Sequence, residues 1–135
     1  FDTQSPNTSS DIYFAEYSDG AFSKAQKIEG LINSQFPDHS PFIAPDKSYI
    51  IFSSFNNSMG LSDLFISFQL TDNKWSIPQN LGNKINTIYD EERPFLHKNG
   101  TLFFSSKGHN SIDDLWILAE SYSCPHKNQN RTLIQ

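Results

Sequence analysis

Apolar residues occur along the chain in short blocks of three or four, separated by polar stretches rich in Asn, Ser, Gly and Pro. Typical blocks are residues 49–52, 64–66, 102–104 and 115–118. Short blocks rich in aromatic and β-branched residues predict β-strands and leave little room for long helices. Because neighbouring positions within a block are all apolar, we expect strands buried on both faces, as in sheets that stack face to face.

The sequence repeats itself with a period of about 52 residues. Residues 22–33 align without gaps on 75–86, and residues 41–54 align on 94–106 with a one-residue difference in the turn. Each period contains four strand candidates, which in the central copy are residues 40–43, 49–54, 63–69 and 75–81. Asn99-Gly100 is a strong hairpin signal between two of them. Four antiparallel strands at this period predict one blade of a β-propeller.

Two other architectures are compatible with parts of the pattern. A β-sandwich also uses short strands and frequent turns, but it gives no reason for a repeat of this length. Residues 84–93 have helix-like apolar spacing, so one short helical turn is an alternative there.

The repeated residues are similar to those of a known family. Residues 40–46, Ile51-Phe52-Ser53-Ser54 and Asp63-Leu64-Phe65 resemble the WD40-like (PD40) propeller repeat of the TolB-type family. Residues 75–106 match it more closely, including Asp90-Glu91 and Asn99-Gly100. The first copy departs from the pattern, because Lys47 replaces a Gly and Asp38-His39 stands where Asp-Glu is expected.

The resemblance implies an all-β fold with about two and a quarter four-stranded blades. Residues 1–118 are expected to form a partial propeller whose complete blade is centred on 40–86, and residues 119–135 a tail or linker. The expected location is the periplasm or the cell surface. A propeller interrupted within a blade is expected to be a fragment of a longer protein or to self-associate through open blade edges.

Most of the repeated residues are expected to be structural. An Asp at the start of the third strand can accept hydrogen bonds from the preceding loop, large aromatics can pack between blades, and small Ser pairs can end the second strand. The residues given this structural role are Asp11, Asp63, Asp114, Phe22, Trp75, Pro41, Pro94, Ser53 and Ser105.

The loops after the second and fourth strands should lie on one face of such a fold, opposite the short hairpin turns. These are residues 33–39, 55–62, 86–93 and 107–113, and loops of this kind carry most binding sites. The charged or imidazole side chains on this face are the candidate ligand contacts: His39, Asp90, Glu91, Arg93 and His109. A structural alternative is that Glu91 or Arg93 pairs with a neighbouring blade.

Charge and composition narrow the classes of partner. The net charge of −5 disfavours nucleic acid, and the mean hydropathy of −0.52 with only short apolar runs disfavours a membrane span. Cys124 and His126 lack a clear further ligand nearby, so neither a metal nor a cofactor is expected.

The sequence therefore favours a non-catalytic binding or scaffolding segment of a bacterial envelope protein, with a protein or glycan as partner. Motifs for a nucleophile elbow, a zinc protease or a phosphate loop are not found in it. The alternative is the propeller portion of a hydrolase, active on peptides or glycans, whose catalytic residues lie outside this chain.

Overall fold

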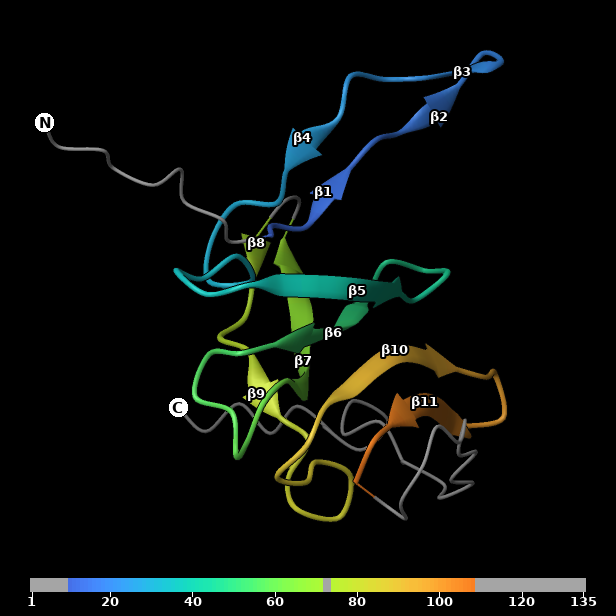
Figure 1. Ribbon diagram of the computed structural model, residues 1–135. Coiled ribbons are helices and arrows are strands. Elements are labelled where there is room, and N and C mark those ends of the chain that lie inside the picture. Colours follow the sequence, from blue (N-terminus) through green and yellow to red (C-terminus); the bar gives the residue numbers. More distant parts are fainter. Residues whose placement is uncertain (1–9, 72–73, 109–135) are drawn as a thin grey trace, which may run out of the picture.

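The computed structural model describes residues 10–71 and 74–108, and in these residues the protein is all-β and contains no helix (Figure 1). The strands are short and mostly antiparallel neighbours along the chain. They are β1 (Tyr13–Phe14), β2 (Tyr17–Ser18), β3 (Ala21–Phe22), β4 (Gln26–Lys27), β5 (Asp38–Ile43), β6 (Tyr49–Ser54), β7 (Asp63–Thr71), β8 (Lys74–Trp75), β9 (Gln79–Asn80), β10 (Glu91–Leu96) and β11 (Leu102–Ser106).

A central antiparallel sheet contains β5, β6, β7 and β8 in that order, with β9 also paired to β7. The register of β6 and β7 runs without a break from Tyr49 opposite Phe68 to Ser54 opposite Asp63. The predicted strands in this copy are confirmed, although the fourth is divided into β8 and β9. Pro78 lies between these two pieces, and it has no N–H group to donate to β7.

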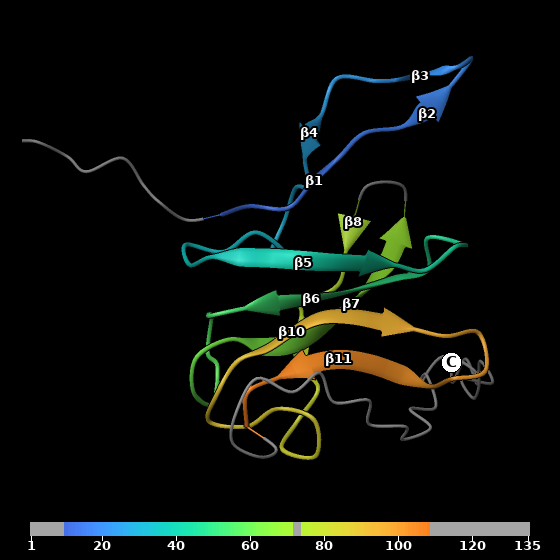
Figure 2. The same ribbon diagram turned by 45° about the vertical axis from the view of Figure 1, so that its right-hand side comes forward.

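Two further antiparallel units flank the central sheet. Strands β1 with β4 and β2 with β3 form a ribbon on one side, and β10 with β11 forms a hairpin on the other. Figures 1 and 2 show the ribbon and the hairpin on opposite sides of the central strands. Each unit belongs to a neighbouring copy of the sequence repeat.

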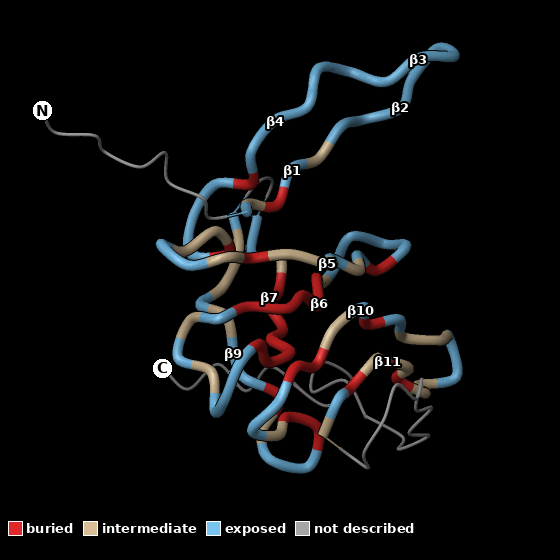
Figure 3. Tube along the Cα trace, in the orientation of Figure 1, coloured by how far each residue is buried: buried red, intermediate tan, exposed pale blue. Residues whose placement is uncertain are grey.

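Apolar side chains of the central sheet pack in both directions. Ile51 and Leu64 belong to one buried cluster with Leu102 of β11. Ile50 belongs to a second buried cluster with Ile12 of the segment that precedes β1. Adjacent residues of β6 thus serve opposite faces, and Figure 3 shows β6 and β7 as the most buried part of the chain. The prediction of strands buried on both faces is confirmed here.

The β5–β6 and β10–β11 hairpins have equivalent irregularities. Each has a register shift after its first two pairs, between His39 and Phe42 in one hairpin and between Glu92 and Phe95 in the other. The residue in the shift has a positive φ in both hairpins, 51° at Ser40 and 54° at Arg93. The motif prolines, Pro41 and Pro94, follow directly. A β-bulge releases a ladder position that a proline cannot fill, which explains the repeated proline.

The strand register corrects one alignment made from the sequence. Asp38 pairs with Ser54 as Glu91 pairs with Ser106, so Asp38 is the counterpart of Glu91. His39 is the counterpart of Glu92. The expected match of Asp38-His39 to Asp90-Glu91 is therefore wrong by one residue.

A second expectation, the alternative of a helical turn at 84–93, is not met. The segment turns once, with the N–H groups of Ile85 and Asn86 both donating to Gly82 O, and then continues without helix.

The two motif aromatics have different surroundings. Trp75 packs against the cluster that contains Ile12 and Ile50. Phe22 lies on β3 with 73% of its surface exposed, and its ring faces Tyr17 at a centroid distance of 5.0 Å. In the described part of the chain Phe22 is thus a surface residue.

Candidate functional site

The loops that were expected to share one face lie together at one end of the central sheet. Phe55 N donates to Pro37 O at 3.2 Å, which joins the loop after β6 to the loop before β5. Glu91 N donates to Ser62 O at 2.8 Å, and Lys107 N donates to Asp90 O at 3.1 Å. We call this group of loops, residues 33–37, 55–62, 86–90 and 107–108, the loop end of the sheet.

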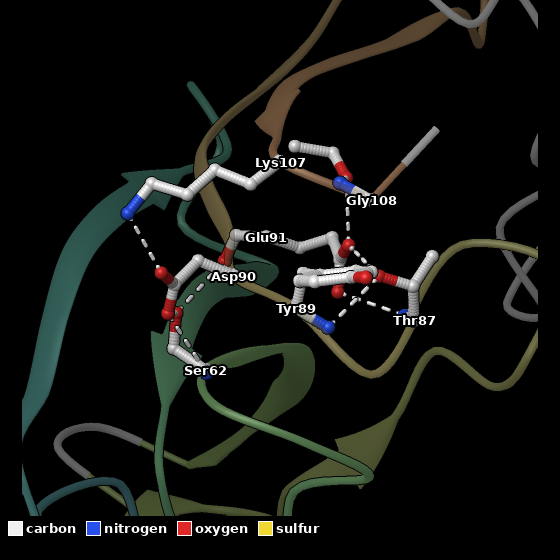
Figure 4. Close-up of polar contacts among 8 residues, drawn as sticks. Ser62, Thr87, Tyr89, Asp90, Glu91, Lys107 and Gly108 are labelled. Carbon is white, nitrogen blue, oxygen red and sulfur yellow. Dashed lines mark hydrogen bonds and ion pairs between the residues drawn. The ribbon is translucent and has the colours of Figure 1, made fainter. Parts of the chain in front are cut away.

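Asp90 lies at the centre of the loop end and is only 9% exposed. Its Oδ2 accepts a hydrogen bond from Lys107 Nζ at 2.9 Å, and its Oδ1 faces the N–H and hydroxyl of Ser62, both at 3.3 Å (Figure 4). Burial tends to raise the pKa of Asp90, but the contacts with Lys107 and Ser62 outweigh it, so the pKa lies below its usual value. Asp90 therefore holds three loop segments together as a carboxylate.

Glu91 is fully buried beside Asp90, and its carboxylate is used within the chain. Oε2 accepts from Thr87 N at 2.8 Å, and Oε1 accepts from Thr87 Oγ1 at 2.6 Å and from Ser106 Oγ at 2.7 Å (Figure 4). These bonds fix the loop before β10 to the end of β11. Glu91 is thus a support of the loop end, and both of its carboxylate oxygens are occupied by donors of the chain itself.

Asp38 occupies the same position one repeat earlier, with a different outcome. Its Oδ2 accepts from Ser34 N at 2.5 Å, as Glu91 accepts from Thr87 N. Its Oδ1 is buried and has no hydrogen-bond partner among the described residues. Ser54 is the counterpart of Ser106, and its Oγ accepts from Asn56 N at 3.0 Å as Ser106 Oγ accepts from Gly108 N at 3.1 Å. Ser106 Oγ also donates to Glu91, whereas Ser54 Oγ makes no bond to Asp38. An Asp side chain is one methylene shorter than Glu, which accounts for the bond that is missing.

A half-open cavity of about 180 Å³ lies beside Asp38. Its apolar wall includes Phe52 and Phe65 of the central sheet. Its polar lining comes from the loop end and from the adjoining ends of β5 and β6, and among the described residues it contains one ionisable side chain, Asp38. The polar residues that line it are Asn33, Ser34, Asp38, Ser54, Asn56 and Asn57.

The remaining candidate residues are spread over the loop end. His39 is half-buried, with its Nδ1 at 3.1 Å from Ser40 Oγ and its ring 6.0 Å from that of Phe55. Arg93 is exposed and is the positive-φ residue of the β10 bulge. The structure therefore brings Asp90 and Glu91 together as a support, while His39 and Arg93 flank it.

Several predicted features fall on residues that the structure does not describe. These are His109, Asp114 with its strand, and the tail at 119–135 with Cys124 and His126.

The repeated aspartates do bind the preceding loop or the adjacent strand. Asp63 Oδ2 accepts from Met59 N at 2.8 Å, as the sequence predicts, and from Asn80 Nδ2 at 2.7 Å. Its counterpart Asp11 pairs through Oδ2 with Lys27 Nζ at 2.7 Å. The hydrogen bond that Lys27 donates to Asp11 raises the pKa of Lys27 above its usual value.

Two asparagines that sequence reasoning did not single out connect the strands of each repeat. Asn33 Oδ1 accepts from Ile12 N at 2.6 Å and its Nδ2 donates to Ile12 O at 3.0 Å. Asn86 does the same with Leu64, at 2.8 and 3.0 Å. The signal was present in the sequence, because an Ile-Asn pair ends both aligned segments.

The described residues contain no cluster of three or more His, Cys, Asp or Glu side chains arranged to hold a metal ion. A search of the same residues for a helix long and apolar enough to cross a membrane also finds none. Comparison with protein-family models, with curated proteins and with solved structures finds no match.

Proposed function

We propose that the chain is part of a β-propeller of the TolB-like, WD40-repeat type that acts as a non-catalytic binding or scaffolding module. In this proposal the central sheet is one four-stranded blade, the β1–β4 ribbon belongs to the blade before it, and the β10–β11 hairpin belongs to the blade after it. The resemblance of the repeat motif to envelope proteins supports a location in the bacterial periplasm or on the cell surface.

The observation that carries the proposal is the structural equivalence of successive repeats. Asn33 and Asn86 make the same two bonds to the backbone of Ile12 and Leu64. The β5–β6 and β10–β11 hairpins share a register and a bulge. A chain that builds one unit repeatedly and covers both faces of the central sheet with its neighbours is typical of a solenoid or a propeller. Four antiparallel strands per repeat favour the propeller.

The stacking of neighbouring units can be tested through Phe42 of β5 and Phe95 of β10. Their rings meet edge to face at a centroid distance of 5.4 Å. A double-mutant cycle with Phe42→Leu and Phe95→Leu should give a coupling energy of about 0.5 to 1.5 kcal/mol. Phe65 packs in the opposite cluster, so a Phe65→Leu and Phe95→Leu cycle is the matched control and should show none. No coupling between Phe42 and Phe95 would contradict the stacked arrangement.

The binding role is assigned to the loop end, because the long loops gather there and the short hairpin turns lie at the other end. The test is a panel of peptidoglycan fragments, envelope oligosaccharides and peptides, measured by biolayer interferometry. His39→Ala and Arg93→Asn should weaken whichever ligand binds, since both side chains flank the loop end and Asn tolerates the positive φ of Arg93.

A variant on the opposite end provides the control. Lys98→Ala changes the turn between β10 and β11 and should leave binding unchanged. Equal losses for the two sets of variants, or turnover of any panel member by the chain itself, would contradict the proposed role.

A further inference from the structure

We propose that the cavity beside Asp38 binds a primary ammonium group, carried by a small amine or by the lysine side chain of a partner protein. This inference rests on the proposed binding role of the loop end and names the chemistry of its ligand. Its starting point is the difference between two equivalent positions, Asp38 and Glu91, one repeat apart.

The unpartnered oxygen of Asp38 is the first observation. Asp38 is 1% exposed, and its Oδ1 has no hydrogen-bond partner among the described residues. A buried carboxylate oxygen is costly unless a donor or a cation lies against it. At the equivalent position Glu91 obtains its donors from Thr87 and Ser106. The described part of the chain therefore supplies donors to both carboxylate oxygens at Glu91 but leaves one oxygen without a donor at Asp38.

The cavity is the second observation. Its volume of about 180 Å³ is larger than a single water molecule requires and is similar to cavities that hold a molecule of about six carbon atoms. Phe52 and Phe65 give it an apolar wall, which suits an alkyl chain. Asn56 and Asn57 of the loop end also line it.

The lining selects a cation over an anion. Of the described residues that line it, Asp38 is the one that is ionisable, and none is Lys or Arg. An ammonium group has three donors and no acceptor, which suits a lining whose residues Asp38, Asn56 and Asn57 each carry a side-chain acceptor oxygen. Lys27 is close enough for an electrostatic interaction with Asp38, but its Nζ is held by Asp11 Oδ2 at 2.7 Å. Asp38 Oδ1 itself has no hydrogen-bond donor among the described residues, which leaves it available to a ligand.

The test is a titration of the full chain with n-butylammonium chloride, followed by amide shifts in ¹⁵N-labelled protein. The backbone signals of Ser34, Asn56 and Asn57 should shift together with a dissociation constant on the order of millimolar, as expected for a ligand of this size. n-Butanol has the same length and no charge, so it should bind at least about tenfold more weakly. Sodium chloride at matched ionic strength should leave these signals in place.

Two variants locate the site. Asp38→Asn removes the charge and should abolish saturable butylammonium shifts. Asp38→Glu keeps the charge but, like Glu91, should turn its second oxygen to the neighbouring Ser, and it should weaken binding at least about tenfold.

Asn57→Gly is a milder variant at a second lining residue. The φ of 53° at Asn57 suits glycine, so the backbone should be retained while binding weakens a few-fold.

The two sources of the ammonium group are separated by Nα-acetyl-lysine amide. Binding as tight as that of butylammonium indicates a lysine of a partner protein, whereas weaker binding indicates a free amine. Equal affinity for butanol and butylammonium would overturn the inference, and so would unchanged binding in Asp38→Asn and Asp38→Glu. A spectrum that does not respond to the amine would also overturn it and would mean that water alone fills the cavity. If the amine fails while His39→Ala still weakens an envelope ligand, the inference fails and the proposed function stands.

Discussion

The side-chain amide of Asn86 makes two hydrogen bonds to the backbone of Leu64, which lies 22 residues earlier in the sequence. Oδ1 accepts from Leu64 N at 2.8 Å and Nδ2 donates to Leu64 O at 3.0 Å, and Asn86 is 1% exposed. Leu64 is the second residue of β7, the strand that pairs with β6, β8 and β9. The contact thus fixes the loop after β9 to the middle strand of its own sheet.

Replacing Asn86 should therefore destabilise the protein strongly. Asn86→Ala leaves the buried N–H of Leu64 without a partner, at a cost of about 1 to 3 kcal/mol, whereas Leu64 O keeps the hydrogen bond from Leu81 N at 3.0 Å. We expect a loss of about 1 to 3 kcal/mol in the free energy of unfolding, measured by urea denaturation. Asn33→Ala is the matched variant in the preceding repeat. It should cost less, because Asn33 is half-buried whereas Asn86 is 1% exposed. Equal losses would show that burial is not what sets the cost.

Exchanging the acidic residues at the two equivalent positions should have opposite effects. Asp38→Glu adds the methylene that Glu91 uses to reach Ser106, so it should bond Ser54 and stabilise the protein by about 1 kcal/mol. Glu91→Asp should lose the bond to Ser106 and destabilise by about 1 to 3 kcal/mol. Thermal and urea unfolding of both variants measure the difference. Destabilisation by Asp38→Glu would mean that the cavity does not admit the longer side chain.

Lys47 is a strained residue at the turn between β5 and β6. Its φ is 59°, and its counterpart in the next repeat is Gly100, with a φ of 93°. A left-handed conformation costs an ordinary residue about 1 to 2 kcal/mol, and glycine avoids this cost. Part of the gain is offset, because glycine loses more conformational entropy on folding than other residues. Lys47→Gly should therefore stabilise by about 0.5 to 1 kcal/mol.

The exposed pair between Lys47 and Glu16, at 3.8 Å, contributes little to this balance. Lys47→Ala is the control, since alanine has the same backbone restriction as lysine and should give no gain. Gly100→Ala should destabilise the protein. A gain with alanine at position 47 equal to that with glycine would point to charge rather than backbone strain.

The ion pair between Asp90 and Lys107 should stabilise the loop end over a defined range of pH. The folded-state pKa of Asp90 is below its usual value of about 4, so its contribution is present above that pH and is lost as the pH falls further. The hydrogen bond that Lys107 donates to Asp90 raises the pKa of Lys107 above its usual value of about 10.5, so the contribution of Lys107 is lost as the pH rises through the higher value.

Asp90→Asn should accordingly flatten the fall in the free energy of unfolding between about pH 4 and pH 2. Glu92→Gln is the control on the adjacent β10, and it should leave most of that slope in place. Chemical unfolding at a series of pH values gives both slopes. An unchanged slope in Asp90→Asn would show that other carboxylates determine the acid limb.

Much of the fold could be predicted from the sequence because its information is local. The apolar block at 49–52 gave β6 nearly to the residue, and the period of about 52 residues located its counterparts. Turn residues such as Asn99-Gly100 marked hairpins, since their backbone preferences act over a few residues. Positions 84–93 were the ambiguous case, because a short apolar spacing fits a turn as well as a helix.

The candidate site was less accessible to sequence reasoning. Charge marked Asp90 and Glu91, but only contacts across the loop end show that both are internal supports. Ser62 and Lys107 carry no distinctive motif, and they matter because folding brings them to Asp90 from 28 and 17 residues away. The repeat position of Phe22 predicts an aromatic packed between blades. In the described part of the chain Phe22 is exposed, because burial of this residue depends on which units lie beside β3.

The sequence by itself determined the strands, the repeat and the residue types at each repeated position, because backbone preference and binary pattern are properties of short segments. Only the tertiary structure decided that Asp38, and not His39, is the counterpart of Glu91 in the preceding repeat, since a one-residue bulge sets the register of both hairpins. It also decided that Asp38 keeps a free oxygen beside a cavity. Asp38 differs from Glu91 by a single methylene. This difference matters only because folding places a serine, Ser106 beside Glu91 and Ser54 beside Asp38, where the longer side chain can reach it.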